Sequence, residues 1–296
     1  MSAVTPDPRS RLAASLLALL ATACGGPAPP TAESPAVAGR IATLSPHLAE
    51  LVYEAGAGAK LVGVAEYSDF PPEVASLPRI GDAFRIDEEA LLALEPDLVL
   101  GWTSGNPAEA IARLRRLGFR VVTLEPTRLA DVAGHIEAIG ELAGTGVAAK
   151  AAAGRYRRTL AGLEARYAEA APVSAFVQLA ARPWYTVTDR HFLGQGLRLC
   201  GGNNVFGGLP GLTAVVSLEA IIAARPGIII ASDMGQPASA VLAEWAPWHD
   251  VPAVAGGHVE TVDADLLSRP AGRVLDGIAT LCAALDRVRG AAPTSG

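Results

Sequence analysis

The sequence lacks several features that mark other classes of protein. It has no basic excess: 24 lysines and arginines stand against 30 aspartates and glutamates, a net charge of −6. Nucleic-acid-binding proteins carry a basic surface, so this balance argues against that class. Half of the residues are hydrophobic, yet no apolar run approaches the ~20 residues that a membrane-spanning helix needs. At 296 residues, the chain can form one large domain or two lobes with separate cores.

Metal-binding and catalytic motifs are also missing. The five histidines show no C-x-x-C or H-x-x-x-H spacing, and no G-x-S-x-G elbow occurs. Ser45 and His47 resemble a nucleophile and its base, but they lie two apart at a predicted helix start, where side chains do not face each other. His47 and Glu50 are three residues apart, a spacing that would allow both to bind one metal ion. An ordinary histidine near the start of a helix is the simpler interpretation. We expect a binding protein rather than an enzyme, with no cofactor and no metal ion.

The N-terminus predicts a secretory signal. Arg9 and Arg11 precede an apolar stretch at 12–23 that is too short to span a membrane stably. The stretch ends at Cys24, and a cysteine at that boundary resembles the lipobox of bacterial lipoproteins. We therefore assign 1–23 to a lipoprotein-type signal peptide and expect Cys24 to be lipidated as the first mature residue.

Plain secretion is the alternative. Ala21 stands where the lipobox usually has leucine, and Ala21-Thr22-Ala23 also fits ordinary A-x-A cleavage. Residues 24–39, rich in glycine, proline and alanine, cannot bury a core and are predicted to form a flexible tether. Either route exports the chain, so we expect a periplasmic or cell-surface protein, lipid-anchored to a bacterial membrane if Cys24 is modified.

Export places the other cysteines in an oxidising compartment. With Cys24 assigned to the lipobox, Cys200 and Cys282 remain as an even pair among the three cysteines. A disulfide is the default for such a pair in an exported protein, and two buried free thiols are the alternative.

From residue 40 onward, strand-like and helix-like segments alternate. Short apolar runs predict buried strands at 40–44, 61–64, 97–101, 120–124, 174–179, 227–231 and 258–262. Apolar stripes predict helices at 46–55, 87–94, 108–117, 192–200, 238–245 and 269–287. This alternation is typical of an α/β fold with parallel sheets.

A helix-forming segment divides the alternation into two lobes. Residues 130–170 consist largely of alanine, glutamate, arginine and leucine, and 147–170 lacks proline. We predict an N-terminal lobe at 40–142, a bridging helix region at 143–171 and a C-terminal lobe at 172–296. Two such lobes joined by a helix would enclose a ligand cleft.

An internal repeat relates the two lobes. Residues 89–100 (EALLALEPDLVL) match 219–230 (EAIIAARPGIII) at an offset of 130, with glutamate, two alanines and proline retained. Each copy predicts a helix, a proline break and a buried strand. The match is short, and α/β units share such patterns, so it supports two similar lobes only together with the alternation.

Several motifs follow one another in a recognisable order. They are Arg-Ile-Ala-Thr-Leu-Ser-Pro at 40–46, Tyr-Ser-Asp-Phe-Pro-Pro at 67–72, Pro-Asp-Leu-Val at 96–99, Trp102, Gly105-Asn106 and Cys-Gly-Gly-Asn-Asn-Val-Phe at 200–206. Over 40–285 the chain resembles the iron-siderophore/vitamin B12 substrate-binding family of bacterial ABC importers, and its cobalamin-binding members in particular. The resemblance implies two Rossmann-like lobes bridged by one rigid helix, together one binding domain at 40–290. It also implies that Cys200 pairs with Cys282.

The resemblance assigns a function and partners. It implies a monomeric receptor that captures cobalamin or a related corrinoid between the lobes and delivers it to the permease and ATPase subunits of an importer. A receptor of the same fold for a ferric siderophore or haem is the alternative. An anionic ferric chelate usually requires several arginines, and Arg182, Arg190 and Arg269 are available.

Aromatic residues make up only 5% of the chain, so their positions are informative. A flat corrin is bound by aromatic faces and a few polar groups, and ligands of α/β proteins bind where strands end. Several aromatic residues follow predicted strands or lie near helix ends. We predict a ligand site made of Tyr67, Trp102, Tyr185, Trp184 and Trp245, to which the resemblance adds Asp265 and Phe84.

The resemblance supports part of this set. Tyr67, Trp102 and Tyr185 match ligand-contacting positions of the family, and Asp265 matches a polar position of its cleft. Each has a simpler interpretation, a half-buried aromatic or a solvated loop carboxylate.

The resemblance also shows a departure. By ungapped alignment, two tryptophans of the B12 pocket correspond to Ala83 and Thr213, and Phe84 is the candidate substitute for the first. The expected pocket is therefore less aromatic.

Glu89 and Glu219 are related by the 130-residue repeat. Each lies in the first turn of a predicted helix, where the helix dipole favours a carboxylate. The resemblance implies that both pair with arginines of the permease. We expect each lobe to present one glutamate to one transporter subunit.

Overall fold

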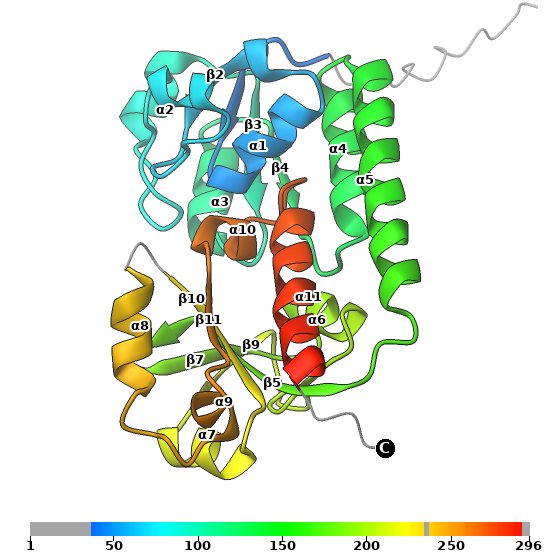
Figure 1. The fold of residues 1–296 in the computed structure, drawn as a ribbon. Coiled ribbons are helices and arrows are strands. Elements are labelled where there is room, and N and C mark those ends of the chain that lie inside the picture. The colour runs from blue at the N-terminus through cyan, green and yellow to red at the C-terminus, as the bar shows by residue number, and fades with distance from the viewer. Residues whose placement is uncertain (1–36, 234–236, 292–296) are drawn as a thin grey trace, which may run out of the picture. The chain divides into compact units, whose positions relative to one another are not determined.

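Short apolar strands build a parallel sheet in the N-terminal lobe (Figure 1). The computed structural model describes residues 37–233 and 237–291. The sheet contains, in spatial order, β2 (Leu61–Val64), β1 (Ile41–Thr43), β3 (Leu98–Trp102) and β4 (Val121–Leu124), and each neighbouring pair is parallel. Because all strands point the same way, their carboxyl ends lie at one edge of the sheet.

Helix α1 (Pro46–Glu54) begins where the sequence predicts. Pro46 occupies the first helical turn, where a missing N–H costs no intrahelical bond. The helix buries its apolar face, including Leu48, Leu51 and Val52, in the main core. Gly56 follows the helix at φ +76°, a left-handed conformation that favours glycine.

Two helices fill the segment at 130–170. They are α4 (Asp131–Leu142) and α5 (Gly146–Tyr167), which lie side by side in Figure 1. A Cβ on Gly140 would come within 2.2 Å of the Ala149 Cβ, so this glycine permits the close approach. Helix α5 then carries the chain into the C-terminal lobe, within the bridging region predicted at 143–171. The predicted fold class, two α/β lobes bridged by one long helix, is confirmed.

The C-terminal lobe contains a second parallel sheet and a smaller antiparallel one. The parallel sheet has the order β11 (Val259–Val262), β10 (Ile228–Ser232), β5 (Val173–Gln178) and β8 (Gly202–Asn204). The antiparallel sheet has the order β6 (Ala180–Ala181), β7 (Trp184–Val187) and β9 (Thr213–Val216). Sequence analysis missed this second sheet because strands of two to four residues are too short to show a period of two.

The internal repeat is visible in backbone detail. Helices α2 (Glu88–Leu94) and α7 (Leu218–Ala224) each begin after a side-chain cap, Asp87 in one copy and Ser217 in the other. Each helix ends at a non-glycine residue in the left-handed region, Glu95 at φ +44° and Arg225 at φ +47°. A proline follows in both copies, and the chain then enters a buried strand.

The last helix starts later than predicted. The range 269–287 was expected to be helical, but α10 (Ala264–Ser268) is followed by a non-helical connection, and α11 spans Val274–Ala291. Arg269 precedes a proline, which disfavours the helical conformation, and its backbone is extended (φ −105°, ψ 101°). The connection at 269–273 reaches the other lobe, as described below.

A disulfide joins Cys200 and Cys282, so the predicted pairing is confirmed. It links the end of α6 (Phe192–Leu199) to α11, and both cysteines are fully buried. The remaining helices are α3 (Ala108–Arg116), α8 (Ala238–Trp245) and α9 (Pro252–Ala255), with 3₁₀ turns at Gly58–Lys60 and Pro72–Ser76. Within 37–233 and 237–291, no helix is both long and apolar enough to cross a membrane. The predicted signal peptide at 1–23 and the predicted lipidation site Cys24 lie outside the described residues.

Candidate ligand-binding cleft

The carboxyl edge of the N-terminal sheet carries three of the predicted ligand contacts. Tyr67 lies just after β2, Trp102 is the last residue of β3, and Phe84 lies in a loop at 81–86 beside that edge. Tyr67 is 76% exposed and Phe84 is 75% exposed. Exposed aromatic rings at or beside strand ends provide a flat apolar surface against which a planar ligand can pack.

Trp102 is held in place by its surroundings. The His47 ring packs against it edge to face, with ring centroids 5.1 Å apart. The Trp102 backbone N–H donates to Asn106 Oδ1 (2.6 Å), and Asn106 Nδ2 donates to the carbonyls of Leu44 (3.1 Å) and Ala83 (2.9 Å). Buried Asn106 therefore ties together the end of β1, the end of β3 and the loop that carries Phe84.

Ser45 and His47 do face each other, contrary to the expectation from their spacing. Ser45 Oγ lies 2.9 Å from His47 Nδ1. The rule for neighbouring helical residues does not apply, because Ser45 precedes the helix and has an extended backbone. Both residues are buried, and burial lowers the pKa of His47 to about 3. The neutral ring supports Trp102, and the described residues contain no cluster of three or more metal-ligand side chains.

The C-terminal lobe contributes a hollow of about 820 Å³. Gln178 at the end of β5 and Ser232 at the end of β10 line it, together with Asp233, Arg182 and one face of α8. These positions again lie at carboxyl ends of parallel strands, where α/β proteins bind ligands. The hollow therefore combines polar groups from two strand ends with an apolar helix face.

One predicted contact on this side is corrected by the structure. Trp245 is 0% exposed, packs against Trp184 with ring centroids 5.0 Å apart, and donates from Nε1 to Gln178 Oε1 (2.8 Å). It is a core residue that fixes Gln178 from behind. Trp184 and Tyr185 lie side by side on β7, so their side chains face opposite sides of the strand. Trp184 is partly buried, and Tyr185 is 40% exposed.

Arg269 connects the two lobes. This buried arginine of the C-terminal lobe donates to the backbone carbonyl of Tyr67 (3.0 Å) and forms ion pairs with Asp265 (2.7 Å), Glu50 (3.4 Å) and Asp69. The Arg269 hydrogen bond lowers the pKa of Asp69, whereas burial raises the pKa of Asp265 despite the same guanidinium. Tyr67 and Asp265, predicted from distant parts of the sequence, thus meet around one side chain.

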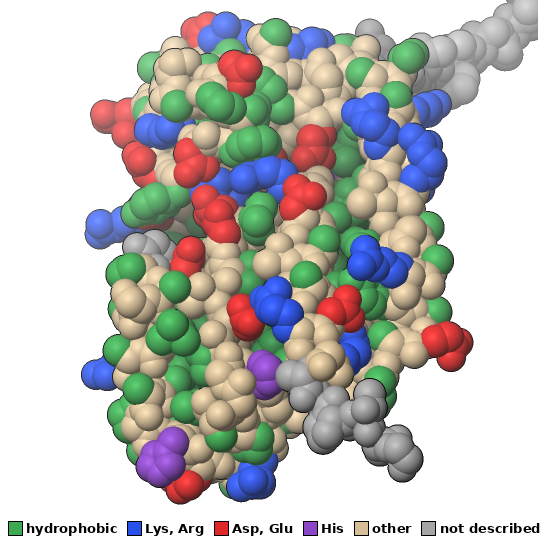
Figure 2. Space-filling model, in the orientation of Figure 1, with side chains coloured by type: hydrophobic (Ala, Val, Ile, Leu, Met, Phe, Trp, Pro, Cys, Tyr) green, Lys and Arg blue, Asp and Glu red, His purple; other side chains and the backbone are tan. Residues whose placement is uncertain are grey.

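Arg273 makes a second connection. Its guanidinium donates twice to Glu50 of α1, with distances of 2.7 and 2.9 Å, and lies 3.7 Å from the centroid of the Phe70 ring. Nearby, the Gly272 N–H donates to Glu54 Oε1 (2.8 Å). We call Glu50, Asp69, Asp265, Arg269 and Arg273 the interlobe cluster. Figure 2 shows acidic and basic side chains gathered where the lobes meet on this face.

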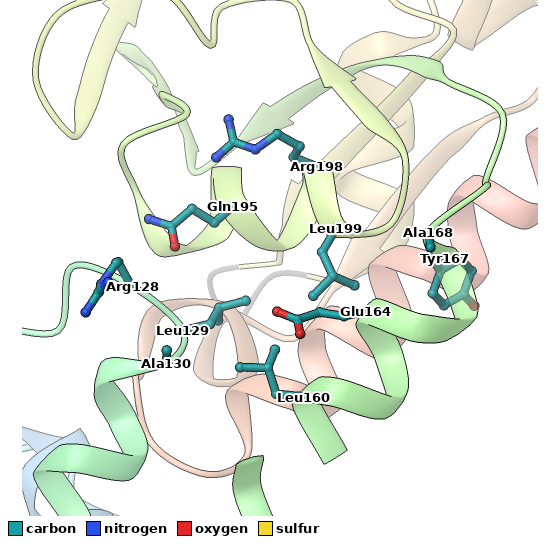
Figure 3. Close-up of a pocket in the computed structure, with 10 residues that line it drawn as sticks. All are labelled: Arg128, Leu129, Ala130, Leu160, Glu164, Tyr167, Ala168, Gln195, Arg198 and Leu199. Atoms are coloured by element: carbon teal, nitrogen blue, oxygen red, sulfur yellow. The ribbon is translucent and has the colours of Figure 1, made fainter. Parts of the chain in front are cut away.

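A second hollow of about 440 Å³ lies beside the bridging helix (Figure 3). Leu129, Leu160 and Leu199 supply its apolar wall. Its arginines are engaged, Arg128 with Asp131 and Arg198 with Asp189. Gln195 donates across the lobes to the carbonyl of Thr127 (2.9 Å), so this hollow belongs to the junction between the lobes.

The other predicted residues lie on the surface. Glu89 and Glu219 are exposed in the first turns of α2 and α7, one in each lobe. Thr213 is exposed at the start of β9, and Ala83 contributes its backbone carbonyl to Asn106. Phe84 follows Ala83 directly and presents the ring that Ala83 lacks.

Comparison with known proteins identifies the family. A family profile described as periplasmic binding protein matches residues 41–266. The chain belongs to the periplasmic binding protein family. It is 35% identical over 255 residues to a vitamin B12-binding protein of Vibrio cholerae serotype O1, covering 86% of this chain and 91% of the relative. The family predicted from the motifs is therefore confirmed.

Solved structures agree with this periplasmic binding protein fold. The crystal structure of the periplasmic vitamin B12-binding protein of Vibrio cholerae has a TM-score of 0.79 at 35% identity, covering 85% of this chain and 98% of that chain. A periplasmic haem-binding protein from Pseudomonas aeruginosa has a TM-score of 0.74 at 25% identity, covering 84% and 92%. The fold thus occurs in proteins named for binding vitamin B12 and for binding haem.

Sequence analysis missed the partners of the cleft residues. The contact between Glu50 and Arg273 spans 223 positions and leaves no local pattern in the sequence. Asn106 belongs to the Gly105-Asn106 motif, which carried no predicted role. The local signal was its place directly after a glycine and four residues after the strand-end Trp102.

Proposed function

We propose that this chain is the substrate-binding component of an ABC importer, which captures cobalamin or a related corrinoid in the cleft between its lobes. The observation that carries the proposal is a set of aromatic residues at or beside strand ends, of which Tyr67 and Phe84 are exposed and Trp102 is partly buried, in a chain 35% identical to a vitamin B12-binding protein. Tyr67, Phe84 and Trp102 would contact one side of the ligand, and Tyr185 and Asp265 the other. Family membership supports a periplasmic location for this receptor.

Charge favours a corrinoid over an anionic ferric chelate. Of the three arginines available for a chelate, Arg269 is surrounded by Glu50, Asp69 and Asp265. The interlobe cluster has three carboxylates and two guanidiniums, so a negative ligand gains little there. Arg182 is the exposed arginine at the hollow, where it approaches Glu244 at 3.8 Å. A ferric siderophore or haem remains the second candidate, because the fold is shared with a haem-binding protein.

The direct test is calorimetric titration of the purified chain with cyanocobalamin, cobinamide, haem and one ferric siderophore. We expect saturable heat with a corrinoid and none with the chelate. Tight siderophore or haem binding without corrinoid heat would move the assignment to the second candidate. Heat with none of the four would remove this ligand assignment.

Trp102→Ala should weaken corrinoid binding by roughly 1–3 kcal/mol, because it removes a large aromatic side chain at the end of β3. Calorimetry of the variant measures the loss. Phe119→Leu is the matched control, since Phe119 precedes β4 and lies at the opposite edge of the same sheet. Equal affinity of Trp102→Ala and the parent would exclude this tryptophan from the site.

Gly105→Ala tests whether the placement of the Trp102 ring matters for ligand binding, because it displaces the ring without removing it. A Cβ at this position would lie 1.9 Å from the Trp102 ring, so the ring must move although every aromatic residue is retained. The variant should therefore resemble Trp102→Ala in affinity.

We propose that Glu89 and Glu219 dock the receptor onto its permease. Both are exposed and repeat-related, and they lie on different lobes, so two similar transporter subunits can each meet one carboxylate. Charge pairs at an interface set orientation and association rate. Replacing both by Ala should slow uptake by roughly tenfold or more while leaving ligand affinity in solution unchanged. Exposed Glu141 and Glu164, replaced together, provide the control; normal uptake by the docking variant would contradict the assignment.

We infer that Cys24 anchors the mature chain to a membrane through a diacylglyceryl group. The support is the sequence boundary between the apolar stretch and the tether. Mass spectrometry of membrane-extracted protein should find the modification on Cys24. A soluble mature chain without it would favour plain secretion.

A further inference from the structure

Two carboxylates of α1 hold the connection at 269–273 of the opposite lobe. Glu50 accepts two hydrogen bonds from Arg273 and lies 3.4 Å from Arg269, and Glu54, one turn later, accepts from the Gly272 N–H. Glu50 is 1% exposed. A buried carboxylate is strongly destabilising unless it is paired and hydrogen-bonded, and both cationic partners of Glu50 come from the other lobe.

The same connection controls the loop that carries Tyr67. Arg269 donates to the Tyr67 carbonyl and pairs with Asp69, and Arg273 covers the Phe70 ring. Tyr67 has φ +64°, a conformation that non-glycine residues seldom adopt and that needs support from surrounding contacts. These contacts come from the C-terminal lobe, so the N-terminal wall of the cleft is partly built by the opposite lobe.

We propose that Glu50 and Arg273 are positioning residues that lock the two lobes together and hold the Tyr67 loop in its binding conformation before any ligand arrives. Neither needs to touch the ligand. Glu50 fixes the guanidinium of Arg273 and approaches Arg269, and the two arginines hold Tyr67, Asp69 and Phe70. The effect on ligand binding rests on the proposed function, whereas the order of the loop does not.

Hydrogen exchange of the ligand-free, full-length chain tests the proposal. In Glu50→Gln, amides at 66–70 should exchange about tenfold faster than in the parent. Opening of this loop should cost less free energy, because the charged contacts of Glu50 no longer have to be broken. Amides of β3 should keep their rates. Arg273→Lys retains the charge but cannot donate two parallel bonds to one carboxylate, so it should give a smaller increase in the same segment. Glu141→Gln, on the exposed face of α4, should change nothing.

The outcomes separate the two proposals. If exchange at 66–70 is unchanged in folded Glu50→Gln, the positioning role is wrong, whatever the chain binds. If exchange rises throughout the sheet in both Glu50→Gln and Arg273→Lys, these residues maintain the fold generally, which also overturns the proposal. If 66–70 alone is faster, ligand release from Glu50→Gln should also be several-fold faster than from the parent. Absence of ligand heat in the parent counts against the proposed function and leaves the exchange result standing.

Discussion

Replacing Cys200 and Cys282 together by alanine should lower the free energy of unfolding by about 4 kcal/mol. The disulfide closes a loop of 82 positions, and its loss enlarges the set of conformations open to the unfolded chain. It also joins α6 to α11, so the cross-link acts within the C-terminal lobe. Denaturant unfolding followed by circular dichroism measures the difference.

The parent protein under reducing conditions is the matched comparison. Once reduced, it should approach the midpoint of the double-alanine variant. The N-terminal lobe lacks the cross-link, so hydrogen exchange in β1 and β3 should change less than in β5 and β10. Coincident midpoints for parent and variant would contradict the expected stabilisation.

Glu54→Gln should change the pH dependence of stability. The pKa of Glu54 is raised from 4.5 to about 7, chiefly by burial and also by the nearby Glu50 carboxylate. The Gly272 N–H and the charges of Arg273 and Arg155 act in the opposite direction. Because the folded state holds the proton more tightly, this group stabilises the fold fully below pH 4.5, and that stabilisation is lost as pH rises to about 7.

The loss amounts to about 3 kcal/mol for a shift of this size. Glutamine stays neutral, so the unfolding free energy of the variant minus that of the parent should increase by that amount between pH 4.5 and 8. The variant is compared with the parent at each pH because other groups also titrate. Burial lowers the pKa of His47 to about 3 and of His191 to about 4, which destabilises parent and variant alike as pH falls. Urea unfolding at four pH values suffices, with Glu141→Gln as control. A constant difference would rule out the raised pKa.

The sequence predicted the fold better than the site because strands and helices leave periodic patterns and contacts do not. The helix at 87–94, the strand at 97–101 and their copies one repeat later were located within about a residue, because caps, apolar runs and prolines mark their ends. Helix α10 was not predicted, and the start of α11 was predicted five residues too early, although Pro270 was the local signal for a break.

For the cleft, the sequence identified strand-end residues but not their burial. Trp245 and Tyr185 were both predicted to contact the ligand, yet Trp245 lies in the core and Tyr185 is exposed. The difference depends on Phe176 and Trp184, which cover Trp245 after folding. Pairs such as Glu50 and Arg273 depend wholly on tertiary packing.

The two connections between the lobes have a thermodynamic consequence for any ligand. Helix α5 joins the lobes covalently, and the connection at 269–273 joins them again through α1. Because the two lobes are restrained at two places, the cleft loses little conformational entropy when a ligand binds. The entropic cost of binding should therefore come mainly from immobilising the ligand itself. The heat-capacity change of binding should then match the apolar surface that the ligand itself covers, with no added contribution from folding or domain closure.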